Sequence, residues 1–251
     1  MAKVLVVASN LGCWGEELQA PWDLLKQAGH TLTLSTYQGK TPLPLAWSVD
    51  HDFRDPNHAL INVAESVDRT LELVHNGEWD NPIKIDDAKM SDYDAICLIG
   101  GFGAPLDING SPAIHRMLIE AWQADKIMGA LCYAVGALAL TRKPDNYHES
   151  IIRGKTVTAH PHEWDWIWAL PYDLYGATPE NPGTKVITPG FVYPLRPLVE
   201  DALGPEGTCV SPPETTRDTP CAVYDHPFVT ALSFESSTYF GQKMVDALAG
   251  K

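Results

Sequence analysis

The alternation of apolar and polar stretches in the first part of the chain predicts a β-α-β unit. Residues 3–8 form a short apolar run, which is typical of a buried strand. Residues 16–28 place apolar side chains at helical spacing and end before Gly29, a common helix stop. Residues 31–36 alternate Thr and Leu, as a strand does. We therefore expect the two strands to pair in parallel through a right-handed crossover.

Further apolar runs extend this pattern along the chain. They predict a third buried strand over residues 95–99, a helix over 111–124, and a strand over 126–131 that leads into an Ala- and Leu-rich helix ending near 140. The remaining predicted elements are a helix over 57–76, a strand over 151–158, a hairpin of 221–224 and 228–232, and a helix over 236–248. This alternation of strands and helices is typical of an α/β protein, and the length allows one large domain or two small ones.

Residues 39–56 break the periodicity. They combine Pro, Trp, Asp and His without a helical or strand repeat. A flexible linker would not need the large apolar side chains of Trp47 and Phe53, which require cover. We interpret the segment as a lid or an insertion loop of the same domain.

Composition and charge narrow the classes of partner. The net charge of −14 argues against nucleic acid or an anionic membrane as the main partner. The five cysteines are scattered without a Cys-x-x-Cys pair, so neither a disulfide framework nor a zinc site is indicated, and a reducing cytoplasm fits best. The apolar run at residues 4–7 is too short for a signal peptide or a membrane span.

Cys132 lies where the predicted strand over residues 126–131 meets the helix that follows. A sharp strand-to-helix turn lifts a nucleophile out of a sheet and points it into a cleft. The start of the next helix supplies unpaired N–H groups and a partial positive charge, which both favour a thiolate. The stretch therefore fits a nucleophilic cysteine, and by itself it fits a buried core cysteine equally well.

Three features in a fixed order resemble a known family. They are an acidic helix start after the first strand, the Gly-Gly-Phe-Gly turn at residues 100–103, and the turn at Cys132. This order resembles the ThiJ/PfpI superfamily over residues 3–158. The resemblance implies a single α/β domain over residues 1–251 with the flavodoxin-like, doubly wound fold of class I glutamine amidotransferase-like proteins. In that fold a mostly parallel sheet has helices on both faces. The chain length and residues 152–158 are most similar to the larger branch, which holds heat-shock chaperones with glyoxalase III activity.

The resemblance implies a role for each matching residue. Cys132 matches the nucleophile, and Glu17 matches the acid that hydrogen-bonds its sulfur. The backbone N–H groups of Gly101 and Tyr133 match an oxyanion hole, an effect worth roughly 3–4 kcal/mol. Glycine at 101 and 103 lets the backbone approach a substrate, so Gly103 is an expected substrate contact. The simpler alternatives are a solvated acid in a first helical turn for Glu17 and an ordinary turn for residues 100–103.

Tyr133 departs from the glyoxalase III pattern, in which a His follows the nucleophile. A phenol with an ordinary pKa near 10 is a poor general base at neutral pH, although its hydroxyl can donate a hydrogen bond. His160 or His162, which follow the next predicted strand, can replace the missing imidazole. Alternatively, Glu17 shuttles the proton without a His, as in the related isonitrile hydratases, or the site has lost its activity.

The same two histidines also resemble a metal site, since His160 and His162 occupy alternate positions and acids follow them. A His-rich surface loop is the simpler interpretation, and we expect no metal here. Trp14, Trp47 and Trp164 are expected to line the substrate pocket.

Two functional hypotheses of different classes follow. The first is a cofactor-independent cysteine enzyme, a lyase, hydratase or hydrolase, acting on a small electrophile such as a 2-oxoaldehyde or an isonitrile. The second is a stress-response chaperone or redox sensor in which Cys132 is oxidised. An amidase or peptidase is a weaker third interpretation, because a crowded turn and a lid leave little room for a peptide. The family analogy adds a homodimer.

Overall fold

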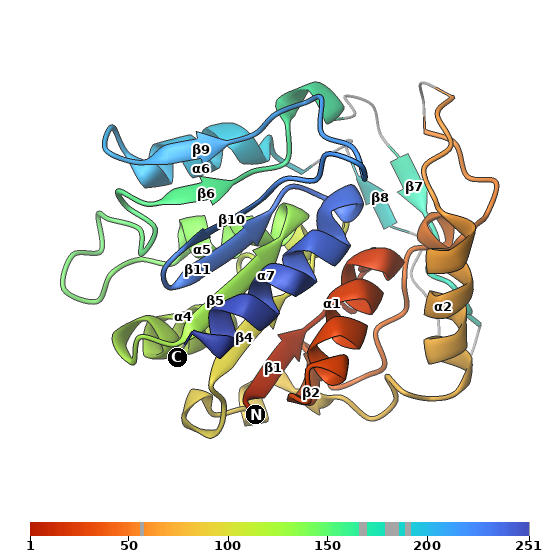
Figure 1. Ribbon diagram of the computed structural model, residues 1–251, viewed down its shortest axis with the longest axis horizontal. Helices are drawn as coiled ribbons and strands as arrows, with labels where there is room; N and C mark the ends of the chain where they lie inside the picture. Colours follow the sequence, from red (N-terminus) through yellow and green to blue (C-terminus); the bar gives the residue numbers. More distant parts are fainter. Residues whose placement is uncertain (56–57, 166–169, 179–185, 189–191, 251) are drawn as a thin grey trace.

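A seven-stranded sheet in the order β10-β11-β5-β4-β1-β2-β3 forms the centre of the computed structural model, which describes residues 1–55, 58–165, 170–178, 186–188 and 192–250 (Figure 1). All neighbouring strands pair in parallel except β10 and β11, which form an antiparallel hairpin. The strands are β1 (Lys3–Val7), β2 (Thr31–Thr36), β3 (Ile83–Lys84), β4 (Ala95–Leu98), β5 (Ile127–Leu131), β10 (Ala222–Asp225) and β11 (Phe228–Ala231). The predicted mostly parallel α/β fold is confirmed.

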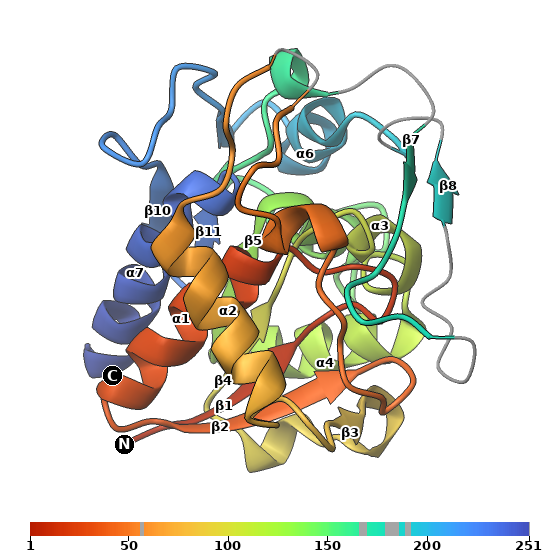
Figure 2. The ribbon, with the colours of Figure 1, turned by 90° about the vertical axis from the view of Figure 1, so that its right-hand side faces the viewer.

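Helices cover both faces of this sheet. Figure 1 shows α1 and α7 on the face toward the viewer and α4 and α5 behind it, and Figure 2 shows α2 beside α1. The helices are α1 (Gly15–Gln27), α2 (Ala64–His75), α3 (Ala104–Asp107), α4 (Pro112–Gln123), α5 (Val135–Leu140), α6 (Leu195–Leu203) and α7 (Ser237–Ala249). The three central strands β1, β4 and β5 are buried along their whole length except for Lys3, because helices pack on either side of them. Within the described ranges, no helix combines the length and apolarity needed to cross a bilayer.

Two small sheets lie outside the main one. They pair β6 (Thr156–Thr158) with β9 (Thr208–Val210), and β7 (Leu170–Tyr172) with β8 (Val186–Thr188). The strand predicted over residues 151–158 was wrong in its first half, where residues 151–154 form a turn. The N–H groups of Thr156 and Thr158 bond to the side chains of Asp225 and Thr230, so β6 lies beside the hairpin without joining its ladder.

The helix predicted over residues 57–76 begins only at Ala64. Asn62 donates to the carbonyl oxygens of Trp47 and Asp50, which ties the preceding stretch to the 39–56 loop in an extended conformation. Part of that loop forms a single helical turn, Ala46–Val49. Pro56, the last residue of the predicted lid, lies outside the described residues.

The strand order reverses at β1, because β2 lies on one side of it and β4 on the other. In such sheets, ligands bind in the crevice at the carboxyl ends of the strands near the reversal. The turns after β1, β4 and β5 all emerge at this edge. These turns contain the three sequence features that resemble the family.

Gly129 on β5 tests how tightly the sheet packs against α7. A Cβ at Gly129 would come within 2.5 Å of Met244 Sδ and 3.0 Å of Phe240 Cζ, which are both fully buried. We expect Gly129→Ala to lower the free energy of unfolding by about 1–3 kcal/mol, because a filled core resists added volume. Urea denaturation measures the change.

Gly110→Ala is the matched control, since a Cβ at Gly110 meets nothing within 4 Å. Its effect should stay within about 0.5 kcal/mol. Equal losses in the two variants would contradict close packing between β5 and α7.

Candidate active site

Cys132 occupies a strained turn directly after β5. Its φ angle is 55°, in the left-handed region that costs a residue with a Cβ about 1–2 kcal/mol. One helical turn, Cys132–Ala134, follows and continues into α5. Only 6% of the residue is exposed, and that part faces a cavity. The chain therefore presents the sulfur from the edge of the sheet, as the sequence predicted.

Glycines in the turn after β4 let the backbone approach this cysteine. A Cβ at Gly100 would lie 2.5 Å from Glu17 Oε2 and 2.7 Å from Cys132 Cβ. Gly101 has a φ of 99°, which also requires glycine. Gly103 has a different role from the predicted substrate contact. It is not among the described residues that line the cavity, and the space beside its Cα is filled by Ser9 and the backbone at Leu11.

Glu17 in the first turn of α1 is buried against Cys132, with 1% of its surface exposed. Burial raises the pKa of this carboxyl well above its ordinary value, and the negative charge of Glu235 adds to the rise. The contacts with the Cys132 side chain and the Gly100 N–H favour the carboxylate, but burial outweighs them. Oε2 has no hydrogen-bond partner of ordinary geometry within the described part of the chain. Glu17 is therefore a carboxyl group able to carry a proton.

The pKa of Cys132 is raised by burial and by the charge of Glu17. The backbone N–H groups of Gly101 and Tyr133 and the side chain of Ser233 oppose this rise by stabilising the thiolate. Ser233 Oγ lies 3.8 Å from the sulfur. The charge of Glu17 disfavours the thiolate, whereas the contact with the Cys132 side chain favours the Glu17 carboxylate, so the titrations of the two groups are coupled and simultaneous ionisation of both is disfavoured.

The phenol of Tyr133 is unsuited to act as a general base in this site. Its hydroxyl donates to Asp165 Oδ1 at 2.7 Å, and burial raises the pKa of the phenol further above its ordinary value, with the charge of Asp165 adding to the rise. His160 Nδ1 lies 3.1 Å from the same carboxylate oxygen, and its ring packs against that of Tyr133 with centroids 5.2 Å apart. Asp165 thus joins the residue after the nucleophile to a histidine from another loop.

The structure distinguishes the two candidate histidines. His160 has a side chain only 7% exposed and lines the cavity with Cys132. His162 has a side chain 65% exposed, lies 3.4 Å from Asp165 Oδ2 through Nδ1, and is not among the described lining residues. In the described ranges, no group of three or more His, Cys, Asp and Glu side chains is placed to hold a metal ion.

Glu235 and Arg217 are polar cavity residues that the sequence analysis missed. Glu235 is 8% exposed, and burial raises its pKa to about 7. Arg217 Nη2 lies 2.6 Å from the buried Glu16, so Glu16 positions this guanidinium. Glu235 could have been identified from its position, because it follows the predicted 228–232 strand and the carboxyl ends of neighbouring parallel strands meet at one edge of the sheet.

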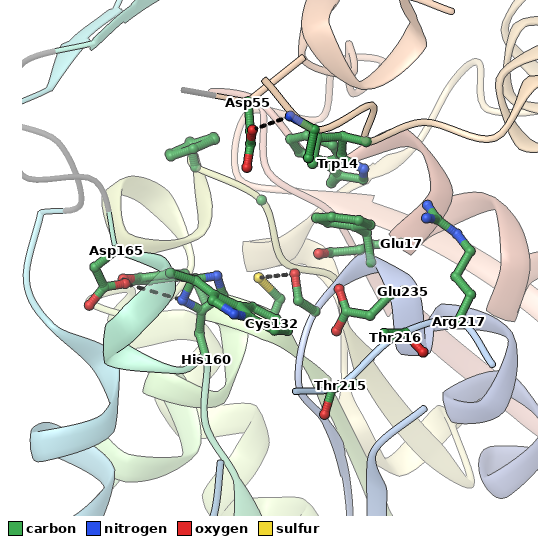
Figure 3. A pocket seen from close by; sticks show the side chains of 18 of the residues that line it. Trp14, Glu17, Asp55, Cys132, His160, Asp165, Thr215, Thr216, Arg217 and Glu235 are labelled. Carbon is green, nitrogen blue, oxygen red and sulfur yellow. Dashed lines mark hydrogen bonds and ion pairs between the residues drawn. The ribbon is translucent and has the colours of Figure 1, made fainter. Parts of the chain in front are cut away.

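The cavity at this edge has a volume of about 630 Å³. Figure 3 shows Cys132 between His160 and Asp165 on one side and Glu235 on the other. Trp14 and Trp164 line the cavity, as expected from the sequence. Trp47 was also expected there, but it is not among the described lining residues and stacks on Phe53 instead. Further lining residues come from the loop before α2 and include Phe53, Asp55, Ala59, Leu60 and Ile61. The cavity-lining part of this loop therefore extends beyond residue 56.

Titration of Glu235 gives a test of this electrostatic arrangement. A carboxyl with a raised pKa binds more protons in the folded state, so it destabilises the fold as the pH rises from its ordinary value of 4.5 through about 7. As the pH rises from 5 to 8, we expect the free energy of unfolding of Glu235→Gln to increase relative to that of the wild type by on the order of 2–3 kcal/mol. Denaturation at both pH values measures the gain. The same difference at pH 5 and pH 8 would exclude this titration.

Comparison with known proteins places the fold. The Parkinson disease protein 7 homolog of Danio rerio is 25% identical over 209 residues, which are 81% of this chain and 91% of that protein. Rapid Encystment Protein 24 kDa of Francisella tularensis has a TM-score of 0.72 and 20% identity, with 99% of each chain covered. Glyoxalase III of Candida albicans has a TM-score of 0.69 and 18% identity, with 98% of this chain and 96% of that chain covered. At these identities the two structural matches show a shared fold.

The sequence pattern of the DJ-1/PfpI family matches residues 2–167. This range contains the turn at Cys132, the buried Glu17 and the glycine turn after β4. The chain therefore belongs to the DJ-1/PfpI family, as its resemblance to the ThiJ/PfpI superfamily predicted.

Proposed function

We propose that the protein is a cofactor-independent cysteine enzyme that adds its thiolate to the carbonyl carbon of a small electrophile, with 2-oxoaldehydes as the favoured class. The observation that supports this most strongly is the convergence of Glu17 and two backbone N–H groups on the Cys132 sulfur at the floor of a cavity. A core cysteine needs none of these partners. The fold shared with a protein named glyoxalase III adds support for an oxoaldehyde.

In the first step the Glu17 carboxylate accepts the proton of the Cys132 thiol, which the contact between the two side chains allows. The proton resides on Glu17 when the sulfur attacks, so the nucleophile is a thiolate beside a neutral acid. Attack of the sulfur on the aldehyde carbon moves the charge to the carbonyl oxygen. The N–H groups of Gly101 and Tyr133 lie beside the attacking atom and can bind that oxygen, an interaction typically worth roughly 3–4 kcal/mol.

The second step requires a base for the proton on the attacked carbon. His160 is suited to this role because it lines the cavity with Cys132 and Asp165 orients its ring through Nδ1. Imidazole removes the proton from the former aldehyde carbon and returns it to the adjacent carbon. The former aldehyde oxygen becomes the carbonyl oxygen of a thioester, and the oxygen on the adjacent carbon takes the proton held by Glu17 to become a hydroxyl. The product is a thioester of a 2-hydroxy acid, and water then cleaves it to release the acid and restore Cys132. The sum is addition of one water to the 2-oxoaldehyde.

Replacement of the nucleophile tests the proposal directly. Cys132→Ser should lower kcat for methylglyoxal by at least about a thousandfold, since the covalent intermediate is lost. Cys221→Ser is the control, because Cys221 is a partly exposed cysteine outside the cavity, and it should keep kcat within about threefold. D-lactate and L-lactate release measure turnover. A Cys132→Ser variant with full activity would exclude this mechanism.

The pair of histidines supplies a matched test of the base. His160→Asn should lower kcat by about 10²–10⁴-fold, the usual contribution of a general base. His162→Asn, two residues away, should keep kcat within about threefold. The rate of Cys132 alkylation by iodoacetamide should be the same in both variants, because neither change touches the Glu17 contact. If kcat is unchanged in His160→Asn, His160 is not the base, and Glu17 would have to carry both the proton of the thiol and the proton of the attacked carbon.

A redox-sensing or chaperone role is the second candidate class from the sequence. It requires Cys132 to be oxidised, and the cavity gives a small oxidant access to the sulfur. Mass spectrometry after peroxide treatment distinguishes the two classes: oxidation of Cys132 without turnover of any carbonyl or isonitrile substrate would favour sensing. Homodimer formation stays a prediction.

A further inference from the structure

The cavity above Cys132 is much larger than the smallest 2-oxoaldehydes. Its volume of about 630 Å³ corresponds to roughly 20 molecules of liquid water at about 30 Å³ each. Methylglyoxal would fill only a small part of this space. Volumes of about 300–1,000 Å³ are typical of sites that enclose much larger ligands. Most of the cavity is therefore available for the group attached to the reacting carbonyl.

Aromatic side chains form a large part of the wall, and each is fixed by packing. Trp14 and Phe234 stack with ring centroids 5.0 Å apart and planes inclined by 20°. Phe53 stacks on Trp47 at 5.3 Å, and Phe102 meets the same indole edge-on at 6.2 Å. Trp47 thus supports two cavity-lining rings from behind. A wall of prearranged rings favours a flat apolar group, since little side-chain freedom is lost on binding.

The charged groups of the cavity disfavour an anionic ligand. Among its described residues, the lining holds five carboxyl groups, Glu17, Asp55, Glu163, Asp165 and Glu235. Arg217 is the one Lys or Arg among the described lining residues, and its charge is already matched by Glu16. The guanidinium also lies over the Phe234 ring, 5.2 Å from its centroid. A carboxylate on the substrate would therefore meet repulsion without a cation to pair with.

We propose, resting on the function proposed above, that the substrate is an uncharged 2-oxoaldehyde whose carbonyl bears an aryl or bulky alkyl group. The rings of Trp14, Phe53, Phe102 and Phe234 form the subsite for this group. The reacting aldehyde carbon lies at Cys132, between His160 and Glu235 (Figure 3).

Turnover of three substrates tests the size and charge of this subsite. Phenylglyoxal should exceed methylglyoxal in kcat/KM by at least about 30-fold after division by their relative reactivity toward a free thiol, since each added carbon in an apolar pocket contributes severalfold or more. 4-Carboxyphenylglyoxal should be at least about tenfold worse than phenylglyoxal. A corrected ratio near one, or equal use of the two aryl substrates, would overturn the proposal.

Phe53→Leu identifies the subsite, since it removes one ring and keeps an apolar side chain. It should reduce the phenylglyoxal to methylglyoxal ratio by at least about fivefold. The control is Tyr147→Leu, which removes a 73% exposed ring outside the cavity and should leave the ratio unchanged. Thermal unfolding of both variants shows that the fold is kept. An unchanged ratio in Phe53→Leu, with the fold intact, would exclude Phe53 from the subsite.

A binding assay separates failure of this inference from failure of the proposed reaction. Acetophenone, acetone and 4-carboxyacetophenone are not 2-oxoaldehydes, so their binding does not depend on turnover. Acetophenone should slow alkylation of Cys132 by iodoacetamide at a concentration at least about tenfold lower than either of the others. This order without any turnover would retain the subsite and reject the reaction. Equal protection by all three would reject the subsite whatever the turnover.

Discussion

The burial of two adjacent ionisable groups is the constraint on which the site depends. Cys132 and Glu17 lie together at the carboxyl edge of the sheet, where burial opposes ionisation of both. Full ionisation of the pair would place two like charges in a poorly solvated space, and full neutrality would leave the N–H groups of Gly101 and Tyr133 without an anion. The proposed mechanism meets both requirements during attack, when a thiolate lies beside a protonated carboxyl.

The backbone geometry around this pair follows from the same requirement. The left-handed turn at Cys132 brings the sulfur to the end of β5, and Gly100 leaves room for Glu17 Oε2 where a Cβ would lie. The strain of a cysteine with positive φ is offset by the packing of β5, which is buried along its whole length. The fold therefore stabilises a local conformation that is unfavourable on its own, as is common at functional sites.

Asp165 gives the residue after the nucleophile a structural role. The phenol of Tyr133 donates to this carboxylate and helps to fix the loop that contains His160. The imidazole thus enters the cavity from a loop rather than from the position next to the cysteine. On the opposite side, Glu235 and the ion pair of Glu16 with Arg217 complete the polar wall.

The extent of sequence-based prediction can be judged from particular residues. The first strand, the helix over 111–124 and the C-terminal helix were predicted to within about two residues, since each is a local pattern of apolar spacing and caps. The helix over 57–76 was predicted too long, because the side chain of Asn62 bonds to backbone that is distant in the sequence. The loop containing Trp47 was predicted as a lid, but the sequence could not show that Phe53, rather than Trp47, faces the cavity.

By itself the sequence determined most of the strands and helices, though not β3, α3, α6 or β9, together with the turn at Cys132 and the candidates for the site, because these depend on neighbours along the chain. The tertiary structure decided which candidates meet. Arg217 and Glu16 are 201 positions apart, and Tyr133 and Asp165 are 32 apart. No periodicity specifies such contacts, since they arise only when the sheet brings the ends of its strands to one edge. The choice between His160 and His162 was likewise made by burial against Tyr133, a property of packing and not of spacing.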